Sequence, residues 1–282
     1  MNRDLEQNIN GLIRQALQED LDQRGDITSD ALVQHHGSAA IFARQQGCVA
    51  GLVVAQRVFH AVNKALNVDI VFGEGDICQK GSKIMQISGS ALSILTAERT
   101  ALNFLARLSA IATMTRQFTD KISHTNARLL DTRKTTPGWR LLEKYATRIG
   151  GAQNHRTGLW DMFLIKENHI KSAGSITKAV SDCRQYMQSH GFTVKIEVET
   201  QTLDEVQEAL ASRVDQIMLD NMTLEEMRDC VKWVDGRVAL EASGNVTLDR
   251  VALIAETGVD YISAGAITHS APAFDFTLLL SD

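Results

Sequence analysis

The sequence predicts a chain of two parts: a mixed α+β segment, followed by a parallel α/β arrangement that forms an incomplete barrel or an open sheet. Three observations carry this prediction. After residue 125, six short apolar runs each end in a polar residue or a glycine, and most of the stretches between them have helical patterns. These six ends recur at intervals of 21 to 33 residues. Before residue 96, short β-like runs are instead broken by glycines.

The first segment opens with a helix and continues into small strands. Apolar residues at helical spacing across 5–21 predict an amphipathic helix. From 38 to 95, glycines separate β-prone runs, which predicts tight turns between antiparallel strands. A helical pattern returns over 96–120, where Leu105 and Leu108 are expected to be buried. This segment therefore reads as a mixed α+β domain.

The second segment repeats a strand followed by a connection, which is a helix in most of the repeats. Its apolar runs read ARLLDTRK, DMFLIK, TVKIEVET, QIMLDN, RVALEASG and DYISAG. The residues at the ends of these runs are Arg133, Lys166, Glu199, Asp220, Ser243 and Gly265. The helices expected between them cover 174–190, 202–211, 223–234 and 247–257. Parallel α/β folds gather their strand ends on one face, so we expect one composite site there.

The length of the second segment limits its number of strands. It spans 143 residues from Ala127 to His269, whereas eight strand–helix units need roughly 250. Six or seven strands fit this length, and 139–155, where the pattern is ambiguous, is the place for a seventh.

The domain boundaries follow from these patterns. The terminal run FDFTLLL has β character and no helix after it, so we expect it to return to the first domain. The expected domains are 1–110 and 111–269, with 270–282 returning to the first.

Composition excludes several classes of protein. The chain has 282 residues, of which 44% are hydrophobic and 22% charged, as in ordinary globular proteins. No apolar stretch is long enough to cross a bilayer, and the first ten residues lack the apolar core of a signal peptide. The four cysteines form no CxxC pair, which argues against a zinc site or a disulfide framework. We therefore expect a cytoplasmic protein.

Positive charge is concentrated in one window. The chain has a net charge of −5, but 133–171 holds eight Lys/Arg and three acidic residues, so it carries +5 and the remainder −10. A cationic island in an acidic protein favours a small anionic ligand over nucleic acid and gives no sign of membrane binding. For Arg140, Lys144 and Arg148, an exposed helix face explains the charge equally well.

Two loops in this window carry the candidate anion-binding cations. The first, DTRKTTPG, places Arg133 and Lys134 at a strand end, and its two threonines can add hydroxyl donors. Arginine suits bidentate contact with a carboxylate or phosphate, while lysine supplies a point charge. In the second loop, His155 and Arg156 follow two glycines, and Lys166 ends an apolar run, where a cation is unusual unless an anion meets it.

The later strand ends carry carboxylates and small residues. Glu199 and Asp220 suit Mg²⁺, ribose hydroxyls or a developing positive charge, and Glu197 is expected on the face of Glu199. The triplets 243–245 and 263–265 suit a phosphate cradle. A phosphorylated sugar with an acidic co-substrate fits all of these features. No GxGxxG, P-loop or serine/cysteine nucleophile motif occurs.

Seven stretches covering nearly the whole chain match one known family. They read ALQEDLDQRGDITS, AERTALNFLARLSAIAT, DTRKTTPG, NHRTGLWDMFLIKENH, IMLDNM, EASGNV and GVDYISAGAITHS. On these, the chain resembles the quinolinate phosphoribosyltransferases, also called nicotinate-nucleotide pyrophosphorylases (carboxylating). The resemblance implies an N-terminal α/β sandwich domain, a C-terminal incomplete α/β barrel of six or seven strands, and a homodimer whose sites lie at the subunit interface.

The resemblance also implies a reaction. It is the transfer of a phosphoribosyl group from 5-phosphoribosyl-1-pyrophosphate to quinolinate, with loss of CO2. The products are nicotinate mononucleotide and pyrophosphate, and the reaction belongs to NAD biosynthesis. It requires Mg²⁺ and no organic cofactor. The enzyme class is therefore a pentosyl transferase.

Roles for single residues are likewise implied by the resemblance. Cationic side chains would hold the quinolinate carboxylates, with Arg99 entering from the partner subunit, and Lys134 would contact pyrophosphate. Glu199 and Asp220 would hold the ribose hydroxyls directly or through Mg²⁺. The substrate-binding residues implied are Arg99, Thr132, Arg133, Lys134, His155, Arg156, Lys166, Glu199, Asp220, Ser243, Gly244, Asn245, Ser263, Ala264, Gly265 and His269. The catalytic residues implied are Lys134, Lys166, Glu199 and Asp220.

Three other functions remain open at this point. A relative of the family associated with molybdenum transport has similar motifs and would act on another substrate. A metal-dependent aldolase or lyase on a similar barrel would need a Schiff-base lysine or a His/Asp metal set, and Lys166 is the only suitably placed lysine. A non-catalytic binding protein would have no reason to place Glu199 and Asp220 beside an anion pocket.

Overall fold

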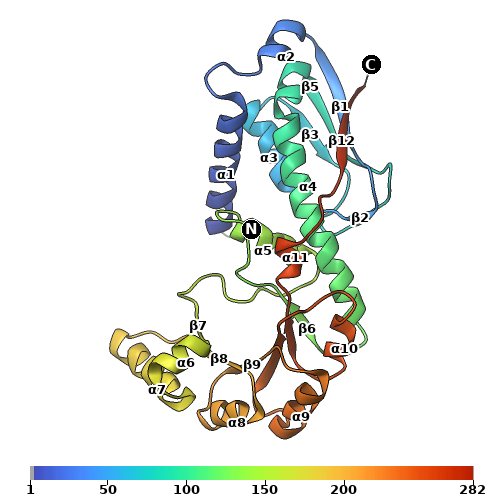
Figure 1. Cartoon of the computed structure of the whole chain (residues 1–282). Helices are drawn as coiled ribbons and strands as arrows, with labels where there is room; N and C mark the ends of the chain where they lie inside the picture. The colour runs from blue at the N-terminus through green and yellow to red at the C-terminus, as the bar shows by residue number, and fades with distance from the viewer. Residues whose placement is uncertain (1–2, 282) are drawn as a thin grey trace. The chain divides into compact units, whose positions relative to one another are not determined.

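The computed structural model of the chain describes residues 3–281 (Figure 1). These residues form two compact units. The first unit contains the chain up to Arg116, Thr135–Gly151, and the chain from Ala271 onwards. The second contains Gln117–Lys134 and Ala152–Ser270. Both units are therefore built from separate stretches of the sequence.

The first unit is an α+β structure. Its antiparallel sheet has the order β12 (Phe276–Ser281), β1 (His36–Ala43), β5 (Lys83–Ser90) and β3 (Asn67–Ile70). A second, two-stranded sheet pairs β2 (Gly47–Cys48) with β4 (Ile77–Cys78). Its helices are α1 (Arg3–Leu21), α2 (Ile27–Leu32), α3 (Leu52–Val62), α5 (Arg140–Ile149) and most of α4 (Ala91–Ile122).

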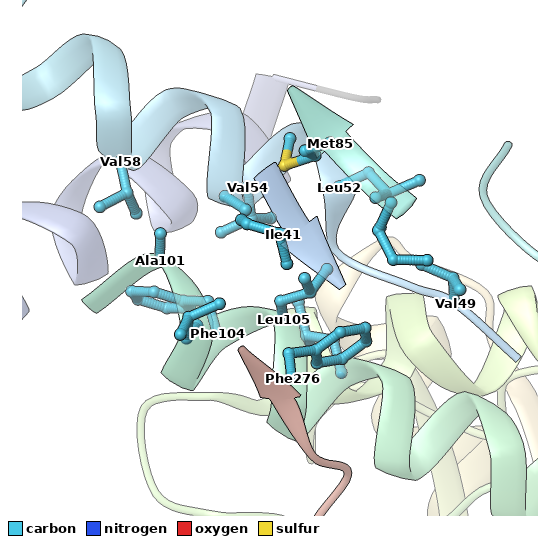
Figure 2. Packing of buried hydrophobic residues seen from close by; sticks show 14 of the residues in the cluster. Ile41, Val49, Leu52, Val54, Val58, Met85, Ala101, Phe104, Leu105 and Phe276 are labelled. Atoms are coloured by element: carbon cyan, nitrogen blue, oxygen red, sulfur yellow. The ribbon is translucent and has the colours of Figure 1, made fainter. Parts of the chain in front are cut away.

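Amphipathic patterns build the core of this unit. In α1, Leu5, Ile9 and Ile13 recur every fourth residue and are all buried. Leu105 and Leu108 of α4 are fully buried, which confirms the prediction from helical spacing. Figure 2 shows side chains of β1, α3, β5, α4 and β12 packed together in one cluster. The C-terminal strand β12 contributes Phe276 to it.

The second unit contains a six-stranded parallel sheet. Its order is β6 (Arg128–Leu130), β11 (Tyr261–Ser263), β10 (Ala239–Ser243), β9 (Gln216–Asp220), β8 (Lys195–Thr200) and β7 (Met162–Ile165). Its helices are α6 (Glu167–Ala173), α7 (Ile176–His190), α8 (Leu203–Ala211), α9 (Leu224–Val234), α10 (Val251–Ala255) and α11 (Ala266–His269). Every strand pair is parallel, and β6 and β7 are its two ends. The predicted α+β and incomplete parallel α/β architectures are confirmed.

The ambiguous stretch 139–155 is mostly helical. It forms α5 and a loop that makes one isolated bridge, between Gln153 and Leu130 of β6. The charged residues of α5 also differ in exposure: Arg148 is exposed, as expected for a solvated helix face, but Lys144 is 3% exposed. The exposed-face explanation is therefore wrong for Lys144. Between residues 3 and 281, no helix is long and apolar enough to cross a membrane.

Gly150 tests the packing of the first unit. A Cβ at this position would lie 2.5 Å from Thr115 Cβ and 2.6 Å from the Ala112 carbonyl oxygen, and the backbone φ of −72° strains no side chain. We expect Gly150→Ala to lower stability by about 1–3 kcal/mol through overpacking. Gly11→Ala, in open space inside α1, is the matched control and should raise stability by about 0.5–1 kcal/mol. Thermal unfolding of both variants measures the two effects. Equal melting temperatures would contradict the close packing around Gly150.

Candidate active site

A cavity of about 820 Å³ opens at the carboxyl ends of the parallel strands in the second unit. Its lining contains every site residue expected from the sequence except Arg99 and Ala264. The lining residues that the sequence did not single out are Leu164, Met218, Asn221, Glu241, Val246, Thr247 and Ala266. Six separate strand ends thus supply one cavity, as their spacing predicted.

The two exceptions lie elsewhere. Arg99 is an exposed residue of α4 in the first unit. Ala264 is buried directly after β11, and its N–H donates to the Leu130 carbonyl of β6 over 3.1 Å. Its backbone therefore contributes to sheet pairing and its side chain does not line the cavity. The roles expected for both residues stay predictions.

Cations occupy one side of the cavity. Arg156 donates through Nη1 to the Met162 carbonyl over 3.2 Å, which anchors its guanidinium to β7. Burial, followed by the nearby charge of Arg133, lowers the pKa of Arg156, although an arginine stays protonated at neutral pH. Two guanidinium groups close enough to perturb one another create a positive site. Such a site favours a ligand that carries negative charge.

The DTRKTTPG loop is held by one internal hydrogen bond and by hydrogen bonds to Thr268 and to side chains of α5. The Thr132 hydroxyl accepts from the Lys134 N–H over 3.0 Å, and Thr268 donates to the Lys134 carbonyl over 2.8 Å. Of the two threonines expected to supply hydroxyl donors, Thr136 donates to the buried Glu143 carboxylate over 2.8 Å. Thr135 accepts from Arg140 over 3.1 Å. Both hydroxyls therefore bond to side chains of α5, and neither residue lines the cavity.

Carboxylates occupy the next two strand ends. Lys166 Nζ pairs with Glu199 Oε2 across adjacent strands β7 and β8. The Glu199 side chain is only 12% exposed, whereas that of Lys166 is 46% exposed. Asp220, at the end of β9, accepts from Asn221 Nδ2 over 2.8 Å. Each carboxylate of the cavity wall thus has a partner already, which fixes its orientation.

A buried polar layer lies beneath these ends. Its members are Glu197 on β8, Gln216 on β9 and Glu241 on β10, and His155 reaches it from the loop before β7. Gln216 Nε2 lies 3.0 Å from Glu197 Oε1 and 2.6 Å from Glu241 Oε2. His155 Nε2 lies 3.1 Å from Glu197 Oε2 and 3.4 Å from Glu241 Oε2.

Protonation links the members of this layer. Burial lowers the pKa of His155, but its hydrogen bonds to Glu197 and Glu241 outweigh this and raise it. Burial and the charge of Glu241 raise the pKa of Glu197 to about 7. The cluster therefore retains an additional proton at neutral pH. Because the Arg156 N–H donates to His155 Nδ1 over 2.8 Å, that nitrogen accepts, and we place the additional proton on the carboxylate pair.

The same hydrogen bond decides whether the layer suits a metal ion. The potential ligand atoms of His155, Glu197 and Glu241 all lie within 4.8 Å of one another. A metal ion at Nε2 would require the ring hydrogen on Nδ1, where the Arg156 N–H already donates. The arrangement is therefore a hydrogen-bonded cluster. Sequence reasoning missed Gln216 and Glu241, although both stand an even number of residues before a strand end.

Two loops interlock on the side of the cavity expected to bind phosphate. Asn221 and Asn245 have φ of 57° and 49°, and Gly244 between the latter and β10 has φ of 92°. The Asn221 N–H donates to the Ser243 carbonyl over 2.9 Å, and Asn245 Nδ2 donates to Asn221 Oδ1 over 3.1 Å. Sequence reasoning missed Asn221. The sequence feature that could have identified it is an asparagine directly after a strand, because asparagine tolerates the left-handed backbone region.

Gly244 provides a test of this interlocking. A Cβ there would lie 2.2 Å from Asn221 Oδ1 and 2.9 Å from Asn221 N, so Gly244→Ala must displace one of the two loops. We expect inorganic phosphate to bind this side of the cavity, and Gly244→Ala to weaken that binding about tenfold or more. Calorimetric titration measures the affinity.

Gly236→Ala is the matched control for this variant. Gly236 has φ of 71° but open space around it, and it does not line the cavity, so it reproduces the backbone strain without the clash. Equal affinities for inorganic phosphate in the two variants would show that the two loops do not depend on one another.

Comparisons with known proteins agree with this geometry. The family model described as quinolinate phosphoribosyl transferase, N-terminal domain, matches residues 26–109, and that of the C-terminal domain matches residues 111–279. The chain is 45% identical over 274 residues to a probable nicotinate-nucleotide pyrophosphorylase [carboxylating] of Synechocystis, covering 96% of this chain and 92% of that protein. It is 42% identical to the chloroplastic nicotinate-nucleotide pyrophosphorylase [carboxylating] of Arabidopsis thaliana, covering 96% and 82%.

Solved structures give the same result. The nicotinate-nucleotide pyrophosphorylase from Francisella tularensis superposes with a TM-score of 0.94 at 40% identity, covering 100% of this chain and 98% of that one. NadC from Streptococcus pyogenes superposes with a TM-score of 0.92 at 39% identity, covering 97% of each chain. The two matched domains together span nearly the whole chain. This chain therefore belongs to the quinolinate phosphoribosyltransferase family.

Proposed function

We propose that this chain transfers the phosphoribosyl group of 5-phosphoribosyl-1-pyrophosphate to quinolinate, releasing pyrophosphate and CO2 and forming nicotinate mononucleotide. One observation carries the proposal. A single cavity holds adjacent guanidinium groups, two carboxylates at neighbouring strand ends, and two loops of small residues. An acidic co-substrate, a ribose and its phosphates each require one of these features. The names of the relatives agree with this assignment.

The guanidinium groups suit the acidic substrate. Arg133 and Arg156 offer planar donors that match the two carboxylates of quinolinate. The two positive charges repel one another, and a bound anion offsets this repulsion. Lys166 is paired with Glu199 in the structure, so an arriving carboxylate would share this lysine with the glutamate. His155 forms part of the pocket floor beneath these cations.

The carboxylates suit the ribose and a magnesium ion. Glu199 and Asp220 offer hard oxygen ligands on the cavity wall, which is the donor type that Mg²⁺ prefers together with substrate phosphates. A bound Mg²⁺ would neutralise charge on the departing pyrophosphate. The two carboxylates stabilise the positive charge that develops on the ribose ring as pyrophosphate leaves. Lys134, exposed at its strand end, is placed to meet the pyrophosphate.

Positioning and the pyridinium product complete the chemistry. Loops 243–245 and 263–265, with His269, hold the 5-phosphate, so that the ring nitrogen of quinolinate meets C1 of the ribose in line. Once the N–C1 bond forms, the adjacent carboxylate leaves as CO2 and the electron pair of the broken C–C bond stays on the ring carbon, where the neighbouring positive nitrogen stabilises it. A proton taken up from solvent then forms the C–H bond of nicotinate mononucleotide. The reaction therefore needs no organic cofactor.

The direct test supplies both substrates with Mg²⁺ and follows CO2 release and nicotinate mononucleotide. We expect product with quinolinate and little or none with nicotinate, which lacks the second carboxylate. Absence of product with quinolinate, or equal turnover of nicotinate, would overturn the proposal. The first result would also favour a relative that acts on another substrate.

Arginine variants test the acidic-substrate pocket. Arg133→Ala and Arg156→Ala should each raise the KM for quinolinate about 10- to 100-fold, since a hydrogen bond to a charged group contributes about 1.5–3 kcal/mol. Arg184→Ala is the control, because Arg184 lies on α7 outside the cavity lining and binds the Arg213 carbonyl. Steady-state kinetics with quinolinate varied measures the effect. A wild-type KM for quinolinate in either cavity variant would show that the arginine concerned does not bind this substrate.

The homodimer is part of the proposal. Arg99 is exposed on α4 of the first unit, and an exposed cation suits a residue that completes the site of a partner subunit. Arg99→Ala and Arg133→Ala should each show little activity alone when quinolinate is held near the wild-type KM. Mixed and allowed to exchange subunits, they should recover about a quarter of wild-type activity, since half of the dimers are mixed and each has one intact site. No recovery after verified exchange would place Arg99 in its own subunit's site.

We place the reaction in a reducing compartment, the cytoplasm. Cys48, Cys78, Cys183 and Cys230 are all free in the structure. Burial raises the pKa of the Cys48 and Cys230 thiols to about 11, so both remain unreactive thiols at neutral pH. Free, inert cysteines support a compartment where disulfides do not form.

A further inference from the structure

The buried layer beneath the cavity has no assigned role in the proposed reaction. Glu197 and Glu241 are 0% exposed and Gln216 is 7% exposed. Removing a carboxylate from water costs several kcal/mol unless partners compensate it, so two of them in a sheet otherwise lined by apolar residues require a reason. Their contacts lead to one residue of the anion pocket.

That residue is Arg156, reached through His155. Gln216 binds both carboxylates, which fixes the oxygen atoms that face His155 Nε2. The ring held in this way presents Nδ1 to the Arg156 N–H over 2.8 Å. The orientation of the imidazole therefore sets the position of the Arg156 backbone.

The same loop is fastened independently at its other side. The buried carboxylate of Asp131 accepts from the His155 N–H over 2.9 Å and from Asn154 Nδ2 over 2.5 Å. Asp131 thus fixes the main chain before the imidazole, while the buried layer fixes the imidazole itself. Arg156 then extends from a segment held at two points.

We propose that Glu197, Gln216 and Glu241 are positioning residues that act through His155 to hold Arg156 where it meets a carboxylate of the acidic substrate. The inference rests on the proposed function. It assigns the layer an effect on the acidic substrate, because its hydrogen bonds lead through His155 to Arg156.

Two variants test the proposal by steady-state kinetics. Glu241→Gln keeps the shape of the side chain and removes its charge, and Gln216→Met keeps the length and removes both donors. Each should raise the KM for quinolinate about tenfold and leave the KM for phosphoribosyl pyrophosphate within about threefold. Glu256→Gln, outside the cavity lining, is the control. Equal changes in both KM values, or no change, would overturn the proposal.

A double-mutant cycle shows whether the effect passes through His155. In a His155→Ala background, Glu241→Gln should change the KM for quinolinate by less than about twofold, because the intermediary has gone. If the factors by which the two substitutions raise the KM for quinolinate multiply in the double variant, Glu241 acts independently of His155. Melting temperatures of all variants identify any that fail to fold.

A measurement on the wild-type protein keeps the test open if the variants do not fold. Nitrogen NMR of histidine-labelled protein, with His155 assigned by comparison with His155→Gln, reports which ring nitrogen carries hydrogen. We expect hydrogen on Nε2 and none on Nδ1, and a hydrogen on Nδ1 would overturn the proposal. A wild-type enzyme inactive on quinolinate would instead refute the proposed function, so the two failures are distinguishable.

Discussion

Parallel pairing of six strands is the constraint on which the site depends. Because each strand of the second unit runs in the same direction as its neighbours, all six carboxyl ends meet at one edge of the sheet. The register then places alternate side chains on the same face. Glu197 and Glu199 of β8, or Glu241 and Ser243 of β10, therefore form successive levels, a fully buried one and one at the strand ends. Loops alone would not place one level of polar side chains beneath another.

The electrostatics of the cavity follow from that layering. Its upper level joins cations and carboxylates that already pair with one another, as Lys166 does with Glu199. Its lower level contains carboxylates whose partners are a histidine and an amide. A polar substrate entering such a site replaces existing hydrogen-bond partners with its own and finds its donors already oriented. The protein thus bears the cost of orientation during folding, before any ligand arrives.

Much of this arrangement could be predicted from the sequence. Strand ends such as Asp220 and Ser243 were recognisable because buried parallel strands are short apolar runs, and the polar residue that ends each run stands out. The charge window identified the cations in the same way. Helices with strong periodicity, such as α7, α8 and α9, lie within one residue or so of the expected stretches.

Other features depended on contacts between distant residues. The burial of Lys144 and the hydrogen bond from Thr136 to Glu143 follow from how α5 packs, which no local pattern of charge reveals. Asn221 and Gln216 were missed because the partners they meet on neighbouring strands or loops, Asn245, Glu197 and Glu241, lie 19 or more residues away in sequence. A sequence pattern identifies which residues face inward, but it does not identify which of them meet.

The interlocked loops have a consequence for how this sequence can change. Asn221 fills the space that a side chain at Gly244 would need, and both positions adopt left-handed backbone conformations. Neither loop can be enlarged while the other stays as it is, so substitutions at the two positions are expected to occur together or not at all. Two stretches of chain separated by more than twenty residues therefore behave, under mutation, as a single unit.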